Sequence, residues 1–185
     1  MPILALMGFS LFLGVASFPT GNAVAPAIVA TPGHSVTLTA YNAVAGQTDS
    51  TPLETASGAF SNPEVVAARS QNLRDELPFG TIIELDGSTV SSGNTCGFDV
   101  VAPIIGYRVI TDSMNARYSD RIDVLIDTKA NFVQTNGREV NAANVLGICK
   151  GVTIRVVGHV AVKDIPSTQA GLAKLVGKPL KVAVK

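Results

Sequence analysis

Two aspartates, Asp112 and Asp123, are the residues of this chain best suited to acid–base chemistry. The segment Tyr107–Ile126 predicts one strand that ends at Asp112, a turn-rich loop, and a second strand that carries Asp123. Both carboxylates lie at the edges of apolar runs, and burial or a neighbouring carboxylate raises a carboxyl pKa. Such a group can donate a proton near neutral pH. The alternative is a capping aspartate held by a salt bridge to Arg117 or Arg121.

The elements that must position these aspartates are short strands and long loops. Charged residues make up 15% of the chain and Trp is absent, while Val, Ile, Thr and Gly are plentiful, which favours β-structure. Residues 42–60 form a long polar loop, and such loops in a compact domain are usually functional or disordered. Strands are predicted at 35–41, 81–85, 107–110, 122–126, 152–162 and 180–184, a strand or helical turn at 64–70, and short helices at 128–135, before Gly137, and at 169–175. This pattern predicts a small, mainly β barrel with short helices and long loops.

Composition argues against several classes of function. The chain has 14 basic and 14 acidic residues, so no basic face is expected to bind nucleic acid. The two histidines, His34 and His159, and the two cysteines are scattered singly along the sequence. Neither a zinc site nor a Cys–His nucleophile is therefore expected. We expect no metal and no cofactor.

The N-terminal part of the chain predicts export. Residues 3–18 are almost wholly apolar but shorter than the roughly 20 residues of a spanning helix. They resemble the apolar core of a secretory signal, and Ala23–Ala25 has the small-residue pattern of a cleavage site. No Lys or Arg precedes the apolar run and Pro26 would follow the cut, so an uncleaved membrane anchor is the alternative. We predict a signal peptide or anchor at 1–25, a linker at 26–35 and a domain at 36–185, exported to the periplasm, the cell wall or the medium.

Cys96 and Cys149 are the two cysteines of the chain, an even number that suits an exported protein with a disulfide. Each lies close to a glycine, Gly97 or Gly147, which is typical of loops that can meet. A bond between them would stabilise the fold by about 4 kcal/mol on the chain-entropy account. A pair of free thiols is the alternative.

A set of short motifs occurs in the order seen in the 3D (three-aspartate) domain family. The motifs are Thr39-Ala40-Tyr41, Gln47-Thr48-Asp49, Thr55–Gly58, Leu77–Thr81, Asp112–Asn115, Arg117-Tyr118 and Arg121–Val124. The ordered set, which covers roughly residues 36–160, carries the resemblance. That family is similar to the catalytic barrel of membrane-bound lytic transglycosylase A and to the barrels of rare lipoprotein A and the expansins. The resemblance implies a six-stranded double-psi β-barrel that acts on or binds peptidoglycan.

The resemblance also implies roles for individual residues. Asp123 matches the strand aspartate that is the general acid/base of the lytic transglycosylases. Asp112 matches the aspartate that opens the family's D-x-[GMN] loop. The family's third aspartate follows a V-A-V/A segment, but here the segment at 65–68 is followed by Arg69, and the nearest spare carboxylate is Asp49.

Two activities follow from the resemblance. As an enzyme, the protein would cleave the β-1,4 link between N-acetylmuramyl and N-acetylglucosamine residues, with Asp123 as acid and then base. Asp112 would raise the pKa of Asp123 or order the loop. Contacts to the glycan strand are expected from Thr39, Tyr41 as a stacking platform, Asp49, Arg117 and Tyr118. The alternative is a non-catalytic barrel that binds or loosens the wall, as the expansin relatives suggest.

Overall fold

The computed structural model describes residues 33–48, 50–90 and 93–177, all of which belong to one unit, Thr31–Lys185. The predicted signal peptide or anchor, most of the linker, Asp49 and the predicted strand at 180–184 lie outside the described residues. Within the described ranges, no helix has the length and apolar character needed to span a bilayer.

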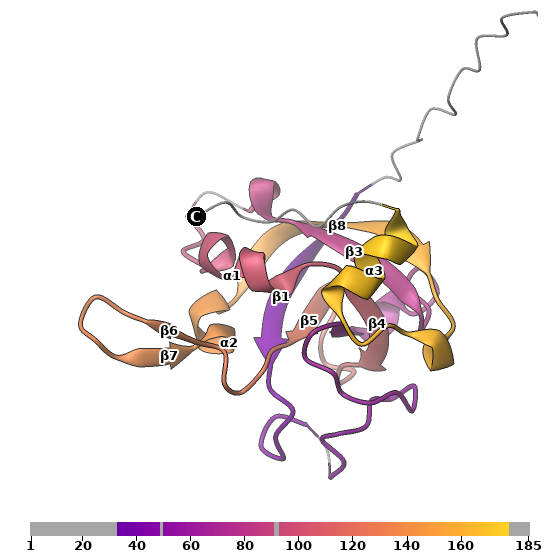
Figure 1. The fold of residues 1–185 in the computed structure, drawn as a ribbon. Helices are drawn as coiled ribbons and strands as arrows, with labels where there is room; N and C mark the ends of the chain where they lie inside the picture. Colours follow the sequence, from indigo (N-terminus) through magenta and orange to yellow (C-terminus); the bar gives the residue numbers. More distant parts are fainter. Residues whose placement is uncertain (1–32, 49, 91–92, 178–185) are drawn as a thin grey trace, which may run out of the picture. The chain divides into compact units, whose positions relative to one another are not determined.

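Six strands close into a barrel, which confirms the mainly β fold with short helices and long loops (Figure 1). The barrel strands are β1 (His34–Tyr41), β2 (Val66–Arg69), β3 (Thr81–Asp86), β4 (Arg108–Ser113), β5 (Arg121–Leu125) and β8 (Cys149–His159). The other elements are the strands β6 (Asn131–Val133) and β7 (Glu139–Asn141), the α-helices α1 (Phe98–Ile105), α2 (Ala142–Leu146) and α3 (Gln169–Val176), and the 3-10 turns η1 (Gln71–Leu73), η2 (Gly87–Thr89) and η3 (Val162–Asp164).

The strand order, β1-β5-β2-β4-β3-β8, contains two interlocked ψ motifs. β5 lies between β1 and β2, which are consecutive in sequence, and it runs parallel to β1 and antiparallel to β2. β2 likewise lies between the consecutive strands β4 and β5 and runs parallel to β4. Exchanging β1 with β4, β2 with β5 and β3 with β8 reproduces every pairing in the barrel. This pseudo-two-fold arrangement is the double-psi topology.

Alternation along the strands sends one set of side chains into the barrel and the other set outward. In β1, Val36 and Leu38 are buried in the interior, whereas Thr37 and Thr39 are partly exposed on the outer face. The interior cluster takes apolar residues from all six strands, among them Leu38, Ala67, Ile83, Ile110, Ile122 and Ile154. A second cluster lies on the outer face at α3 and includes Val66, Val109, Leu125, Leu172 and Ala173. Because these side chains fill the interior, the outer face is the face of the sheet that a ligand can reach.

Cys96 and Cys149 form the predicted disulfide, with their Cα atoms 5.3 Å apart. Cys96 lies two residues before α1, and Cys149 is the first residue of β8. The bond therefore fixes α1 and its preceding loop to a barrel strand. A disulfide fits an oxidising compartment, either the periplasm or the outside of the cell.

Most predicted elements are found, but the predicted helix at 128–135 is wrong. That segment enters a hairpin in which β6 pairs antiparallel with β7. Gly137 has a φ of 80°, and its N–H donates to the Gln134 carbonyl at 2.8 Å. The glycine expected to stop a helix is therefore a hairpin turn residue that follows Asn136, a pairing typical of tight turns. Neither α1 nor α2 is among the predicted elements.

Candidate functional site

Four residues form a row across the outer face of the barrel. The strand register pairs Thr39 with Asp123, Asp123 with Ala68, and Ala68 with Asp112. Residues paired in this way point to the same face of a sheet. Because neighbouring strands lie about 4.8 Å apart, the Cα atoms of the two aspartates are about 10 Å apart. The two aspartates singled out from the sequence thus share one face, with an alanine methyl between them.

A β-bulge in β4 brings Asp112 into this row. Ala67 pairs with Ile110, and both belong to the interior cluster, but the next pair is Ala68 with Asp112. Thr111 is therefore an extra residue in β4. If the register were regular, Ala68 would pair with Thr111, and Asp112 would point into the barrel. One inserted residue decides that this carboxylate reaches the outer face.

The surroundings of Asp123 favour its protonated form. Burial raises the pKa of Asp123 from 3.8 to about 6, and the charge of Asp112 acts in the same direction. The hydrogen bond from Thr39 and the charge of Arg121 act in the opposite direction. The Thr39 hydroxyl donates to Asp123 Oδ1 at 2.9 Å. Part of Asp123 remains exposed, so a ligand on the outer face can reach an acid that is protonated at mildly acidic pH.

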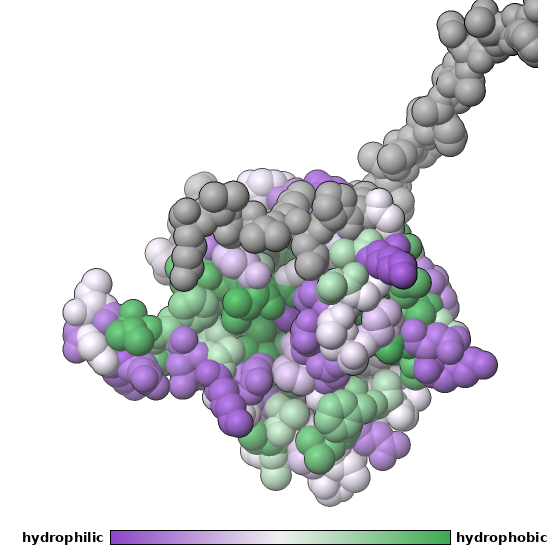
Figure 2. Space-filling view, viewed as in Figure 1, coloured by the Kyte–Doolittle hydropathy of each residue, from purple (hydrophilic) through white to green (hydrophobic). Residues whose placement is uncertain are grey.

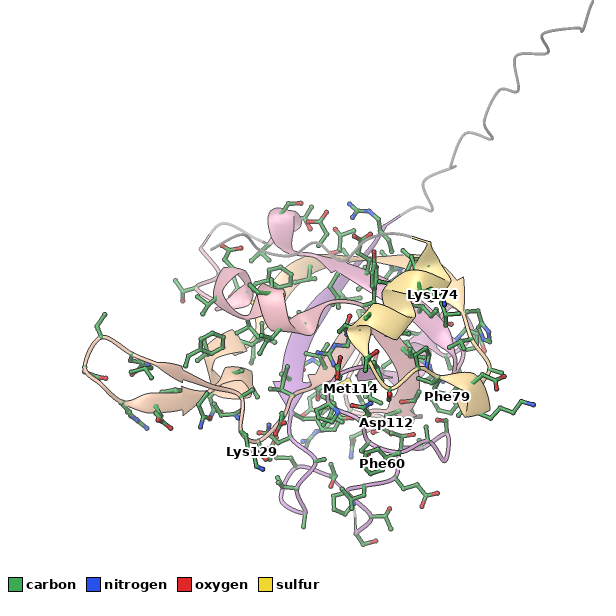
Figure 3. All side chains as sticks on the ribbon, viewed as in Figure 1. Phe60, Phe79, Asp112, Met114, Lys129 and Lys174 are labelled. Carbon is green, nitrogen blue, oxygen red and sulfur yellow. A yellow bond between two sulfur atoms is a disulfide. The ribbon has the colours of Figure 1, made fainter. Side chains whose placement is uncertain are left out.

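Three donors from the protein hold Asp112. The Tyr41 hydroxyl donates to Asp112 Oδ2 at 3.2 Å, and the backbone N–H groups of Ala56 and Ser113 donate to Oδ1 at 3.0 and 2.8 Å. Ala56 belongs to the long loop between β1 and β2, so Asp112 ties that loop to the barrel (Figure 3). The loop held at Ala56 differs from the loop that Asp112 opens in the sequence, which begins at Ser113.

Phe60, and not Tyr41, has an exposed aromatic ring. Tyr41 is only 8% exposed, and burial, together with the charge of Asp112, raises the pKa of its hydroxyl. Its ring therefore has no open face for the stacking expected from the sequence. Phe60 is 66% exposed, and it forms an antiparallel bridge with Glu54 in the same loop as Ala56, whose N–H donates to Asp112. Figure 3 shows Phe60 at the same end of the barrel as Asp112, and Figure 2 shows hydrophobic surface at that end.

Arg117 and Arg121 gather around Tyr118. Their guanidinium carbons lie 4.7 and 4.5 Å from the centre of the Tyr118 ring. Arg117 Nη2 also donates to the Tyr118 hydroxyl at 2.8 Å. Within the described residues, neither arginine forms an ion pair with Asp112 or Asp123. A cation–π cluster is found where the sequence allowed a capping salt bridge.

No cluster of metal-ligating side chains is found in the described part of the chain. That part contains no group of three or more His, Cys, Asp or Glu side chains able to hold a metal ion. A pocket away from the row is lined by Gly33, His34, Glu76, Leu77, Ile154 and Val156, and it includes neither aspartate.

No protein-family model matches this chain, and no curated protein matches it. The resemblance to the three-aspartate family therefore rests on the ordered short motifs alone.

Proposed function

We propose that this protein is an exported enzyme that cleaves the glycan of peptidoglycan at the β-1,4 link between N-acetylmuramyl and N-acetylglucosamine residues. The observation that carries the proposal is the partly buried carboxyl of Asp123, whose pKa is raised to about 6. It receives a hydrogen bond from Thr39 and shares its row with Asp112. A carboxyl of this kind is protonated at mildly acidic pH and faces the outside of the barrel, where a polymer can bind.

One carboxyl is sufficient for both steps of such a cleavage. Asp123 gives its proton to the glycosidic oxygen while the bond from that oxygen to muramyl C1 breaks, leaving an oxocarbenium-like sugar. The resulting carboxylate then accepts the proton of the muramyl C6 hydroxyl as that oxygen bonds to C1. The products are a 1,6-anhydro end and a new N-acetylglucosamine hydroxyl, and Asp123 is protonated again. No water is consumed.

Asp112 acts as a positioning residue in this scheme. Its two oxygens accept hydrogen bonds from Tyr41, Ala56 and Ser113, so its carboxylate is committed to the protein. Its charge nevertheless contributes to the raised pKa of Asp123. Losing Asp112 would therefore release the loop at Ala56 and would also lower the pKa of Asp123.

The loop bound by Asp112 offers an apolar surface for the sugar rings. Phe60 and Leu53 are 66% and 60% exposed, and the Ser61 N–H donates to the Leu53 carbonyl, which brings the two ends of this segment together. Exposed apolar side chains that are held in place in this way are typical of binding surfaces. Aromatic rings suit the apolar faces of sugars because they combine a large contact area with few rotatable bonds.

The decisive experiment measures products. Purified protein is incubated with isolated murein between pH 4 and 8, and the soluble fragments are identified by mass spectrometry. The wild type should release fragments with 1,6-anhydro ends, and Asp123→Asn should release none while keeping its fold. Asp164→Asn is the matched control, because Asp164 is an exposed aspartate in η3.

A non-catalytic binding barrel is the second candidate, and one observation favours it. The hydrogen bonds of Asp112 hold the loop that carries the exposed Leu53 and Phe60 side chains, and this apolar surface can bind a polymer without any proton transfer. Wild-type protein that binds murein but releases no fragments at any pH would establish this reading instead.

A further inference from the structure

A basic side chain lies one step along the strand from the proposed acid. Arg121 precedes Asp123 by two residues in β5, and the two residues pair with Thr37 and Thr39 of β1 on the outer face. Two residues of a strand span about 6.6 Å, so the backbone positions of Arg121 and Asp123 are about that far apart. The charge of Arg121 is close enough to lower the pKa of Asp123.

Arg121 and Arg117 form a cluster of two cations on one ring. Because both guanidinium carbons lie within 4.7 Å of the Tyr118 ring centre, they are within about 9 Å of each other, roughly one Debye length. Arg121 Nε is buried and has no hydrogen-bond acceptor among the described residues. Within the same residues, no carboxylate forms an ion pair with either arginine. The cluster thus has an N–H donor without an acceptor and positive charge that no carboxylate of the described residues pairs with.

We propose that Arg117, Tyr118 and Arg121 bind a carboxylate of the glycan and so place a muramyl residue, not an N-acetylglucosamine residue, beside Asp123. The planar guanidinium matches a carboxylate with two parallel hydrogen bonds, and the ring holds the guanidinium in place. This inference rests on the proposed function. A muramyl residue has such a group in its lactyl ether, which is either free or linked to a peptide that carries carboxylates of its own.

The position of the cluster gives this contact a consequence for the acid. The field of Arg121 works against the raised pKa of Asp123 while the site is empty. A carboxylate paired with Arg121 would offset that field and favour the proton on Asp123. A neutral sugar chain lacks this effect. The cluster would therefore distinguish peptidoglycan from glycans built of N-acetylglucosamine alone.

The test compares three oligosaccharides by isothermal titration calorimetry, using Asp123→Asn protein so that no cleavage occurs. One ligand is the neutral tetramer of N-acetylglucosamine, the second is the alternating tetrasaccharide with free lactyl carboxylates, and the third carries peptides on those carboxylates. At low salt, a carboxylate-bearing ligand should bind about tenfold more tightly than the neutral one, and the difference should shrink as salt is added. The ligand with the larger gain identifies the lactyl group or the peptide as the source of the carboxylate.

Substitutions in the cluster should remove the preference without removing binding. Arg121→Gln and Arg117→Gln should bring the charged ligands to the affinity of the neutral one, whereas Arg121→Lys, which keeps the charge, should retain part of the preference. Arg138→Gln is the matched control, because Arg138 is an exposed arginine in the β6–β7 turn. Circular dichroism and thermal unfolding verify that each variant is folded.

Three results would overturn the inference, and they differ in whether they also overturn the proposed function. Equal affinity for all three ligands in the parent protein removes the carboxylate site and leaves the proposed glycan cleavage intact. Failure to bind any of them removes the glycan site altogether. A preference that persists in folded Arg121→Gln and Arg117→Gln protein assigns the carboxylate to other residues and also overturns the inference.

Discussion

Replacing Asp123 with asparagine should change how the free energy of unfolding depends on pH. In the folded protein, burial raises the pKa of Asp123 from the ordinary 3.8 to about 6. Between these two values the folded chain holds a proton on Asp123 that the unfolded chain has released. The folded state therefore binds more protons, and its stability falls as the pH rises through this window. Asparagine does not titrate, so the variant lacks this loss.

The size of the effect follows from the same two values. At 1.36 kcal/mol per pKa unit, a change from 3.8 to about 6 corresponds to about 3 kcal/mol. Near pH 4 the variant and the wild type should differ little, because asparagine also accepts the Thr39 hydrogen bond. Above pH 7 the variant should be more stable by up to about 3 kcal/mol.

Urea denaturation at intervals between pH 4 and 7.5 measures this difference directly. Hydrogen bonds with Ser88 and Arg155 lower the pKa of Asp86 to about 2, and the stability lost as Asp86 is protonated below about pH 5 is the same in both proteins. Asp164→Asn, at the exposed surface, should follow the wild-type curve. A gap between Asp123→Asn and the wild type that stays constant across the range would show that the Asp123 carboxyl is not destabilised by burial, and the argument for the acid would fail with it.

Two further predictions concern the disulfide and the hydrogen bond between Thr39 and Asp123. Reduction of the Cys96–Cys149 bond, or replacement of both cysteines with alanine, should lower the free energy of unfolding by about 4 kcal/mol, given the separation of 53 residues; a loss below about 1 kcal/mol in urea denaturation would contradict the stabilising role. Thr39→Val removes a hydrogen bond that lowers the pKa of Asp123, so this pKa should rise further above its value of about 6, as followed by carbon NMR of the labelled carboxyl. An unchanged or lower value would mean that this bond does not favour the carboxylate.

Strand β1 was predictable because alternation of apolar and polar residues is a local signal, shown by Thr37 between Val36 and Leu38. Strand β2, with the sequence VAAR, has no such alternation, so its segment was predicted as either a strand or a helical turn. Helix α1 has no such signal, since Pro103 lies inside it and glycines flank it. Its Phe98, Val101 and Ile105 are buried against the barrel interior, so packing with distant strands decides that this segment is helical. The hairpin at β6 and β7 was missed because Gly137 suits a helix end as well as a turn.

The site was predictable only where a side chain carries chemistry of its own. Asp112 and Asp123 stand out as carboxylates beside apolar runs, and Thr39 belongs to a recognisable motif. Ala68 and Thr111 bring them together, one by being small and the other by being an extra residue in a strand. Neither property depends on a distinctive residue type. A bulge is defined by the partner strand, so a sequence read along one strand does not show it.

The pseudo-two-fold of the barrel explains why the two aspartates have different surroundings. The operation that exchanges β2 with β5 and β1 with β4 makes Ala68 the equivalent of Asp123, and Asp112 the equivalent of Thr39. In one half, a hydroxyl therefore stands beside a carboxyl and binds it directly at 2.9 Å.

In the other half, Asp112 stands beside a methyl group that can donate nothing, so it takes its hydrogen bonds from Tyr41, from Ser113 and from the loop at Ala56. A polar residue at position 68 would compete for Asp112 and release the loop. The small apolar residue is thus what couples the barrel to the loop that carries Phe60, while Asp123, with its single donor, keeps its second oxygen for a proton.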